Sequence, residues 1–186
     1  MASMYAAVRI GTPWSRAGFG GQFYVRPLEG TGLPTCSLVF VQSADGNTVA
    51  ENPASLGGGV TDYHVVYEGL SRVAADAVLA GAGTVRGGKA VFSVWHPELV
   101  ELRRTWSLPR HPTQIVTTMR GVDLDQGLLF NTPDLHVVIL TGSGGAMAMQ
   151  ESLDARPWIR VVALQDLTLS GVQPPLSAVT ISLGSR

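Results

Sequence analysis

The chain has 186 residues, of which 45% are hydrophobic and 15% are charged, and its formal net charge is −1. This length suits one α/β domain with a buried core and is too short for two large domains. The near-neutral charge argues against general nucleic-acid binding, and no apolar run is long enough to span a membrane. Cys36 is the only cysteine. Because it has no disulfide partner and no secretory signal is evident, we expect a cytoplasmic protein.

Residues 1–35 are rich in glycine and proline, with aromatic and apolar residues between them. We expect them to form an irregular N-terminal arm that packs against the domain or a second subunit. The β-branched and aromatic run at 37–42 then predicts a buried strand, which leads into a turn that contains Asp45. Asp45 is a turn former in one interpretation, and in the other it is a carboxylate presented to a ligand at a strand end.

The apolar residues within 62–74 recur at helical spacing and predict an amphipathic helix that lies on a sheet. Thr61 is the candidate N-cap of this helix. Arg72 stands near its C-terminal end, where the helix dipole favours a cation. His64 and Glu68 are four residues apart, but no third metal ligand is nearby, so an exposed pair is favoured over a metal site.

An apolar run at 77–80 ends in the string Gly-Ala-Gly-Thr-Val-Arg, which is typical of a buried strand followed by a tight loop. Gly81 and Gly83 permit positive φ and the close approach of a ligand to exposed backbone N–H groups. The Thr84 hydroxyl and the arginine that follows suit a phosphate. An ordinary glycine-rich turn explains the same residues, so both interpretations stay open.

The rest of the chain alternates helices with apolar strands. The expected strands cover 114–118, 135–140 and 158–163, and the expected helices cover 98–106, 146–153 and 172–183. A second glycine-rich loop, at 141–145, directly follows a strand, and two such loops favour a phosphate-bearing ligand. The pattern predicts an α/β sandwich with a mostly parallel sheet. We expect this sheet to lack a last strand, because the chain stops just after a helical segment.

Several of these stretches together resemble the reductase family of riboflavin biosynthesis, the C-terminal reductase domain of the bifunctional deaminase-reductase, which shares the dihydrofolate reductase fold. In order within 36–183, the similar stretches lie at 38–46, 56–74, 76–86 and 114–118. The resemblance implies a three-layer α/β/α sandwich over 36–186. It also implies an NADPH-dependent pyrimidine reductase that is a homodimer. Its reaction would be hydride transfer to the opened ribose of a 5-amino-6-(5-phosphoribosylamino)uracil-like substrate.

On the matching positions, the resemblance implies a set of cofactor-binding residues that stand at or after strand ends. They are Gly81, Gly83, Thr84, Thr117, Thr118, Thr141, Gly142 and Ser143. Asp45 and Arg72 would lie toward the substrate, with Arg72 on its phosphate. The resemblance assigns no metal and no catalytic acid or base, because the cofactor carries the hydride and the protein supplies position and charge.

Two departures from the family pattern leave other functions open. The family usually has an acidic residue two positions after the matching arginine, where this chain has Gly88. Family members also continue with a strand and a Glu-Gly-Gly loop on the cofactor pyrophosphate, for which this sequence has no counterpart. One alternative is a shortened, non-catalytic module that binds nucleotide weakly or serves as an assembly partner. The other is a dihydrofolate reductase-like enzyme that acts on a pterin.

Overall fold

The computed structural model describes residues 8–10, 23–25, 36, 38–39, 46, 63–86 and 88–165. The chain divides into two compact units, each built from segments that are far apart in the sequence. The first unit contains Met1–Gly30, Thr35–Ala74 and Ser93–Arg110, and the second contains Thr31–Pro34, Ala75–Phe92 and His111–Arg186. No helix in the described parts of the chain is long and apolar enough to cross a membrane.

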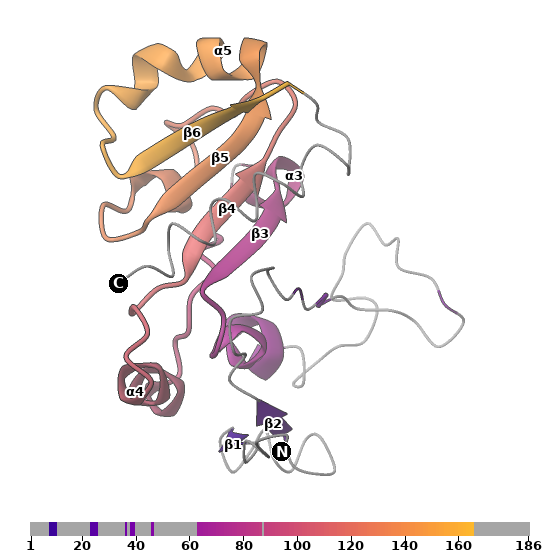
Figure 1. Cartoon of the computed structure of the whole chain (residues 1–186), viewed down its shortest axis with the longest axis vertical. Helices are drawn as coiled ribbons and strands as arrows, with labels where there is room; N and C mark the ends of the chain where they lie inside the picture. Colours follow the sequence, from indigo (N-terminus) through magenta and orange to yellow (C-terminus); the bar gives the residue numbers. More distant parts are fainter. Residues whose placement is uncertain are drawn as a thin grey trace, which may run out of the picture. The chain divides into compact units, whose positions relative to one another are not determined.

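The second unit is built on a four-stranded parallel sheet whose strands lie side by side in chain order (Figure 1). They are β3 (Ala77–Gly81), β4 (Thr113–Thr117), β5 (Val137–Gly142) and β6 (Ile159–Leu164). The two central strands are almost continuously buried, which agrees with their apolar sequences, because both faces of such a sheet are covered. The predicted α/β class is confirmed, and so are the strands predicted at 77–80, 114–118, 135–140 and 158–163, each within a few residues.

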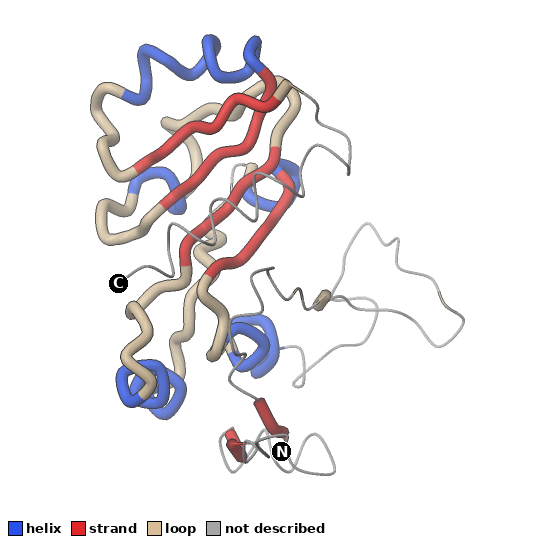
Figure 2. The backbone as a smooth tube through the Cα atoms, viewed as in Figure 1, coloured by secondary structure: helices blue, strands red, loops and turns tan. Residues whose placement is uncertain are grey.

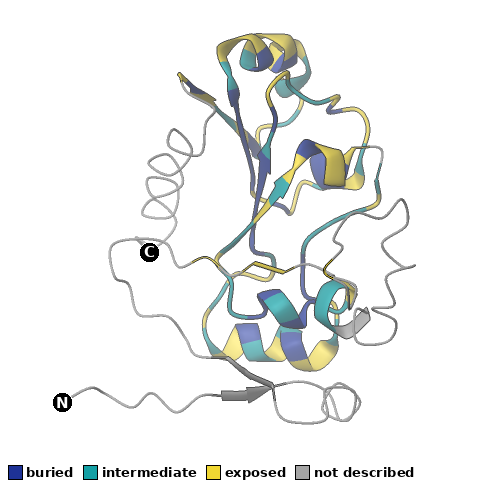
Figure 3. Cartoon of the chain, turned by 90° about the vertical axis from the view of Figure 1, so that its right-hand side faces the viewer, coloured by how far each residue is buried: buried dark blue, intermediate teal, exposed yellow. Residues whose placement is uncertain are grey.

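The helices of this unit are α3 (Ala82–Val85), the 3-10 helix η4 (Leu128–Asn131) and α5 (Ser143–Leu153). Helix α5 packs on β5 and β6. On one face of the sheet, strand residues such as Val116 and Ile139 form a core with Phe130 and Met149. A second cluster, on the other face, consists of strand residues, among them Val138. In Figure 3 the central strands are mostly dark blue, whereas the exposed face of α5 at the top is yellow.

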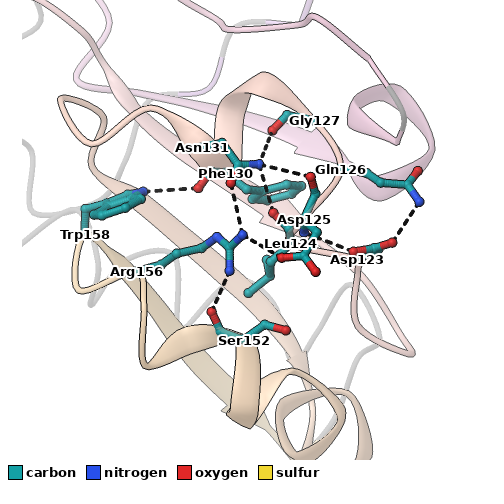
Figure 4. A network of polar contacts seen from close by, with 10 residues as sticks. All are labelled: Asp123, Leu124, Asp125, Gln126, Gly127, Phe130, Asn131, Ser152, Arg156 and Trp158. Carbon is teal, nitrogen blue, oxygen red and sulfur yellow. Dashed lines mark hydrogen bonds and ion pairs between the residues drawn. The ribbon is translucent and has the colours of Figure 1, made fainter.

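A network of polar contacts fastens the loop before β5 to the turn before β6 (Figure 4). The Arg156 guanidinium donates to Asp125 Oδ1 at 2.7 Å, to Asn131 Oδ1 at 3.0 Å and to the Ser152 carbonyl at 2.8 Å. Asn131 Nδ2 in turn donates to the carbonyls of Leu124 at 3.0 Å and Gly127 at 2.9 Å. The loop therefore depends on side chains for hydrogen bonds that regular structure would otherwise supply.

The first unit contains the π-helical turn η2 (Tyr63–Tyr67), the 3-10 turn η3 (Leu70–Arg72) and the helix α4 (Pro97–Thr105), drawn in blue in Figure 2. The prediction of one continuous helix over 62–74 is wrong, because Gly69 interrupts it with a φ of +93°. A Cβ atom at Gly69 would lie 2.5 Å from the Ser93 carbonyl oxygen, so that glycine alone fits here.

Helix α4 confirms the prediction at 98–106 within one residue. His96 caps its first turn, since the imidazole Nδ1 accepts a hydrogen bond from the Glu98 backbone N–H at 3.3 Å. Pro97 at the first helical position and acidic Glu98 in the first turn favour a helix start at this point. Buried Leu99 joins α4 to the small apolar core of this unit, which also contains Leu70, Val73 and Val94.

The N-terminal third of the chain is described at few positions. The strands β1 (Val8–Ile10) and β2 (Phe23–Val25) pair antiparallel, so the prediction of a wholly irregular arm is wrong at these residues. Leu38 and Val39 belong to no strand and are 84% and 49% exposed, which contradicts the predicted buried strand at these two positions. A β-branched run favours a strand only where neighbouring strands and buried surface support it. Asp45, Thr61 and the predicted helix at 172–183 lie outside the described residues.

Candidate functional site

The predicted cofactor residues all belong to the second unit and gather at one edge of its sheet. Because the strands are parallel, their carboxyl ends lie at the same edge, and the register sets Gly81 opposite Thr117 and Thr117 opposite Leu140. Thr118 directly follows β4, and Thr141 and Gly142 end β5. We call this region, with Gly83, Thr84 and Ser143 on the helices that follow, the carboxyl edge.

The turn from β3 into α3 is open on its outer side. Gly81 has extended backbone with a φ of −75°, and Gly83 and Thr84 lie in a single helical turn. The predicted tight loop is a single helical turn, and neither Gly81 nor Gly83 adopts the positive φ that glycine permits. A Cβ atom on Gly81 or Gly83 would meet nothing within 4 Å, and Thr84 is exposed. These residues leave backbone and a hydroxyl accessible to a ligand.

Thr117, which ends β4, and Thr118, which follows it, have different surroundings. Thr117 is half-buried, and its hydroxyl lies 3.5 Å from the Ala80 carbonyl oxygen. Thr118 is buried, and its hydroxyl donates to the Gly121 carbonyl at 2.8 Å. Gly121 has a φ of +88° and turns the chain sharply. The Thr118 hydroxyl therefore stabilises this turn, and Thr117 is the more accessible of the two.

The junction of β5 and α5 combines a packed inner side with an exposed outer side. Thr141 is fully buried, and its hydroxyl has no hydrogen-bond partner among the described residues. That hydroxyl lies against Gly145, where a Cβ atom would also be 2.8 Å from the Gly121 backbone nitrogen. Ser143 is exposed, no side chain caps the first turn of α5, and no acidic residue stands in that turn. The first N–H groups of α5 can therefore receive an anion.

Arg72, the predicted phosphate residue, ends η3 in the first unit and is only 8% exposed. Its Nε donates to the Ser93 carbonyl at 2.6 Å. Burial lowers the pKa of the Arg72 guanidinium to about 10, which still leaves it charged at neutral pH. Buried Arg103 supports this turn, because its guanidinium donates to the carbonyls of Val73 at 3.0 Å and Pro109 at 2.8 Å.

Arg110 is a residue that the sequence analysis did not single out. Its Nη1 donates to the Ser93 hydroxyl at 3.1 Å and to the Val94 carbonyl, and its guanidinium lies 5.5 Å from the centre of the Trp95 ring. Burial of part of the side chain lowers the pKa of Arg110. Arg110 stands between prolines in an irregular segment, where no motif or periodicity distinguishes it from a surface arginine.

Within the described residues, no group of three or more His, Cys, Asp or Glu side chains could hold a metal ion. The second predicted substrate residue, Asp45, lies outside the described part of the chain. No protein-family model matches the chain, and no curated protein matches it either. The function is therefore inferred from the carboxyl edge and from the arginines of the first unit.

Proposed function

We propose that this chain is an NADPH-dependent reductase of the riboflavin-pathway type, with a dihydrofolate reductase-like sandwich. Its substrate would be a 5-amino-6-(5-phosphoribosylamino)uracil-like compound, and the reaction is hydride transfer to the opened ribose. The observation that supports it best is the carboxyl edge, where Gly81, Thr117 and Gly142 end neighbouring parallel strands. Ligands of open α/β sheets bind outside the carboxyl ends of the strands. A cytoplasmic homodimer is part of the same proposal.

The exposed residues of the carboxyl edge would contact the cofactor directly. Open space beside Gly81 and Gly83 admits a ligand close to the backbone. The Thr84 hydroxyl and the first N–H groups of α5, beginning at Ser143, supply donors for phosphate oxygens. The bound cofactor would supply the hydride, and the protein would hold and orient both reactants.

The buried residues of the same edge would act through packing. Thr118 holds the turn at Gly121, and Thr141 lies against Gly145 at the start of α5. Both side chains thereby position the loops that would bind the cofactor. Arg72, buried without an acidic partner among the described residues, would bind the substrate phosphate.

A non-catalytic module that binds nucleotide weakly is the second candidate, and the strand order favours it. Open α/β sheets bind ligands in the crevice where the strand order reverses. The described strands run in the order β3-β4-β5-β6, so this part of the sheet contains no such reversal. An edge without such a strand reversal lacks the crevice that these ligands occupy, which predicts lower affinity.

Titration with NADPH, followed by the fluorescence of the nicotinamide ring, tests the proposal. We expect saturable binding that Thr84→Val weakens by about tenfold, because a hydrogen bond to a charged phosphate is lost. Thr105→Val, which alters an exposed threonine of α4, is the matched control and should leave the affinity unchanged. Absence of saturation at millimolar NADPH would contradict both candidates. Binding without oxidation of NADPH by the pyrimidine substrate would support the second candidate.

A further inference from the structure

Two guanidinium groups of the first unit are anchored on one residue, Ser93. Arg72 Nε donates to the Ser93 carbonyl at 2.6 Å, and Arg110 Nη1 donates to the Ser93 hydroxyl at 3.1 Å. Ser93 is fully buried, so its carbonyl and its hydroxyl are fixed relative to each other. The contacts therefore hold two cations close together, although Arg72 and Arg110 are 38 residues apart in the sequence (110 − 72).

Both arginines keep donors that are not used within the described part of the chain. No acceptor there binds Nη1 or Nη2 of Arg72, and none binds Nε or Nη2 of Arg110. Two ion pairs between described residues are Arg104–Glu101 and Arg156–Asp125, and neither involves Arg72 or Arg110. A guanidinium is a planar fork of donors that matches the oxygens of a phosphate, and two forks at one place can bind one such group together.

The surroundings of the pair favour an anion over water. Burial lowers the pKa of both guanidinium groups, which reflects the cost of removing each charge from water. Arg103 fixes the backbone on both sides, because it donates to the carbonyls of Val73, next to Arg72, and Pro109, next to Arg110. The site is therefore rigid before a ligand arrives.

We propose that Arg110 is a second phosphate-binding residue, which acts with Arg72 on the phosphomonoester group of a small molecule. Two cations match the double negative charge of this group, whereas a carboxylate carries one charge. Exposed Arg110 meets the ligand from the solvent side, and the Trp95 ring steadies it by a cation–π contact. The assignment of Arg72 to the substrate phosphate rests on the proposed function, but that of Arg110 rests on the contacts at Ser93.

Calorimetric titration of the full chain with ribose 5-phosphate, in the absence of cofactor and at constant ionic strength, tests this inference. We expect Arg110→Ala to weaken binding by at least about tenfold and Arg110→Lys to weaken it less, because lysine keeps the charge but loses the fork. Arg104→Ala is the matched control. It removes the same charge from an exposed side chain of α4 that is paired with Glu101, and it should leave the affinity unchanged.

Comparison of these ligands and variants distinguishes specific phosphate binding from a general charge effect. Inorganic phosphate should bind at the same place and compete with ribose 5-phosphate, whereas ribose should not bind. Equal weakening by Arg110→Ala and Arg104→Ala would show a general charge effect and overturn the inference, as would the absence of ribose 5-phosphate binding. Failure of NADPH to bind while ribose 5-phosphate binds would instead overturn the reductase proposal and leave the role of Arg110 intact.

Discussion

At the scale of single residues, glycine has two distinct roles near the carboxyl edge. Gly81 and Gly83 border open space, and neither adopts the left-handed backbone that would require glycine. Gly145 lies against the Thr141 hydroxyl and the Gly121 backbone nitrogen, where a side chain does not fit. Packing therefore accounts for glycine at position 145. Nothing in the described structure requires glycine at 81 or 83, where a ligand that approaches the backbone would account for it.

Alanine substitutions separate these two roles. Gly145→Ala should lower the free energy of unfolding by about 1–3 kcal/mol, because the added methyl group overpacks the junction of β5 and α5. Gly83→Ala should leave it unchanged or raise it by up to about 1 kcal/mol, because alanine favours the helical turn of α3. Urea denaturation measures both effects. If Gly83 contacts the cofactor, Gly83→Ala will also weaken NADPH binding, and equal stability losses in the two variants would contradict this account.

At the scale of elements, the loop between β4 and β5 is held by hydrogen bonds from the side chains of Asn131 and Arg156. Asn131 joins η4 to the carbonyls of Leu124 and Gly127, and it accepts a hydrogen bond from Arg156 (Figure 4). Asn131 and Asp125 are both exposed, and 76% of the Asp125 side chain is accessible. The loop should depend more on the Asn131 amide, which makes several hydrogen bonds, one of them to the part-buried Leu124 carbonyl, than on the Asp125 carboxylate, because an exposed ion pair contributes little.

We expect Asn131→Ala to lower the free energy of unfolding by about 1–3 kcal/mol, since several backbone carbonyls lose their donor. Asp125→Ala should lower it by no more than about 1 kcal/mol, and its effect should shrink further in high salt because the ion pair is screened. Thermal and urea denaturation of both variants, at low and high ionic strength, would show the difference. A larger loss for Asp125→Ala would mean that the ion pair, and not the amide, holds the loop.

At the scale of the whole molecule, the two units carry different chemistry. The second unit presents backbone and hydroxyl donors at the carboxyl edge, and the first unit presents the paired guanidinium groups of Arg72 and Arg110. Each unit is assembled from segments separated in the sequence, so that neither can be cut out as one continuous piece. The two proposed ligands should therefore be tested on the full chain.

Hydrogen exchange with each ligand alone should distinguish the units. Ribose 5-phosphate should slow amide exchange at 70–74 and 93–96, and NADPH should slow it at 81–86 and 141–145, because a ligand that binds the native state suppresses local opening around its site. Mass spectrometry of peptic fragments measures this protection. Protection of the same segments by both ligands would contradict the assignment of separate contacts to the two units.

Local sequence patterns were enough to predict most of the sheet. Apolar runs bounded by glycine, proline and polar residues predicted β3 to β6, and α4 was predicted from its spacing, because these signals are local to each segment. The same reasoning failed at 62–74, where the local pattern is helical but Gly69 must fit against Ser93, 24 residues later (93 − 69). It also could not separate exposed Thr84 from buried Thr118 and Thr141.

Which residues contact one another, however, depends on the tertiary structure. The strand order, the packing of Gly145 on Thr141, and the anchoring of Arg72 and Arg110 on Ser93 all join residues that no local pattern connects. Arg110 lies in an irregular segment, where no sequence periodicity points to it. Only the carbonyl and hydroxyl groups around its guanidinium indicate a binding role. Local composition was therefore enough to predict the strands. The proximity of Arg72 and Arg110 could not be predicted, because it depends on how segments distant in the sequence fold together.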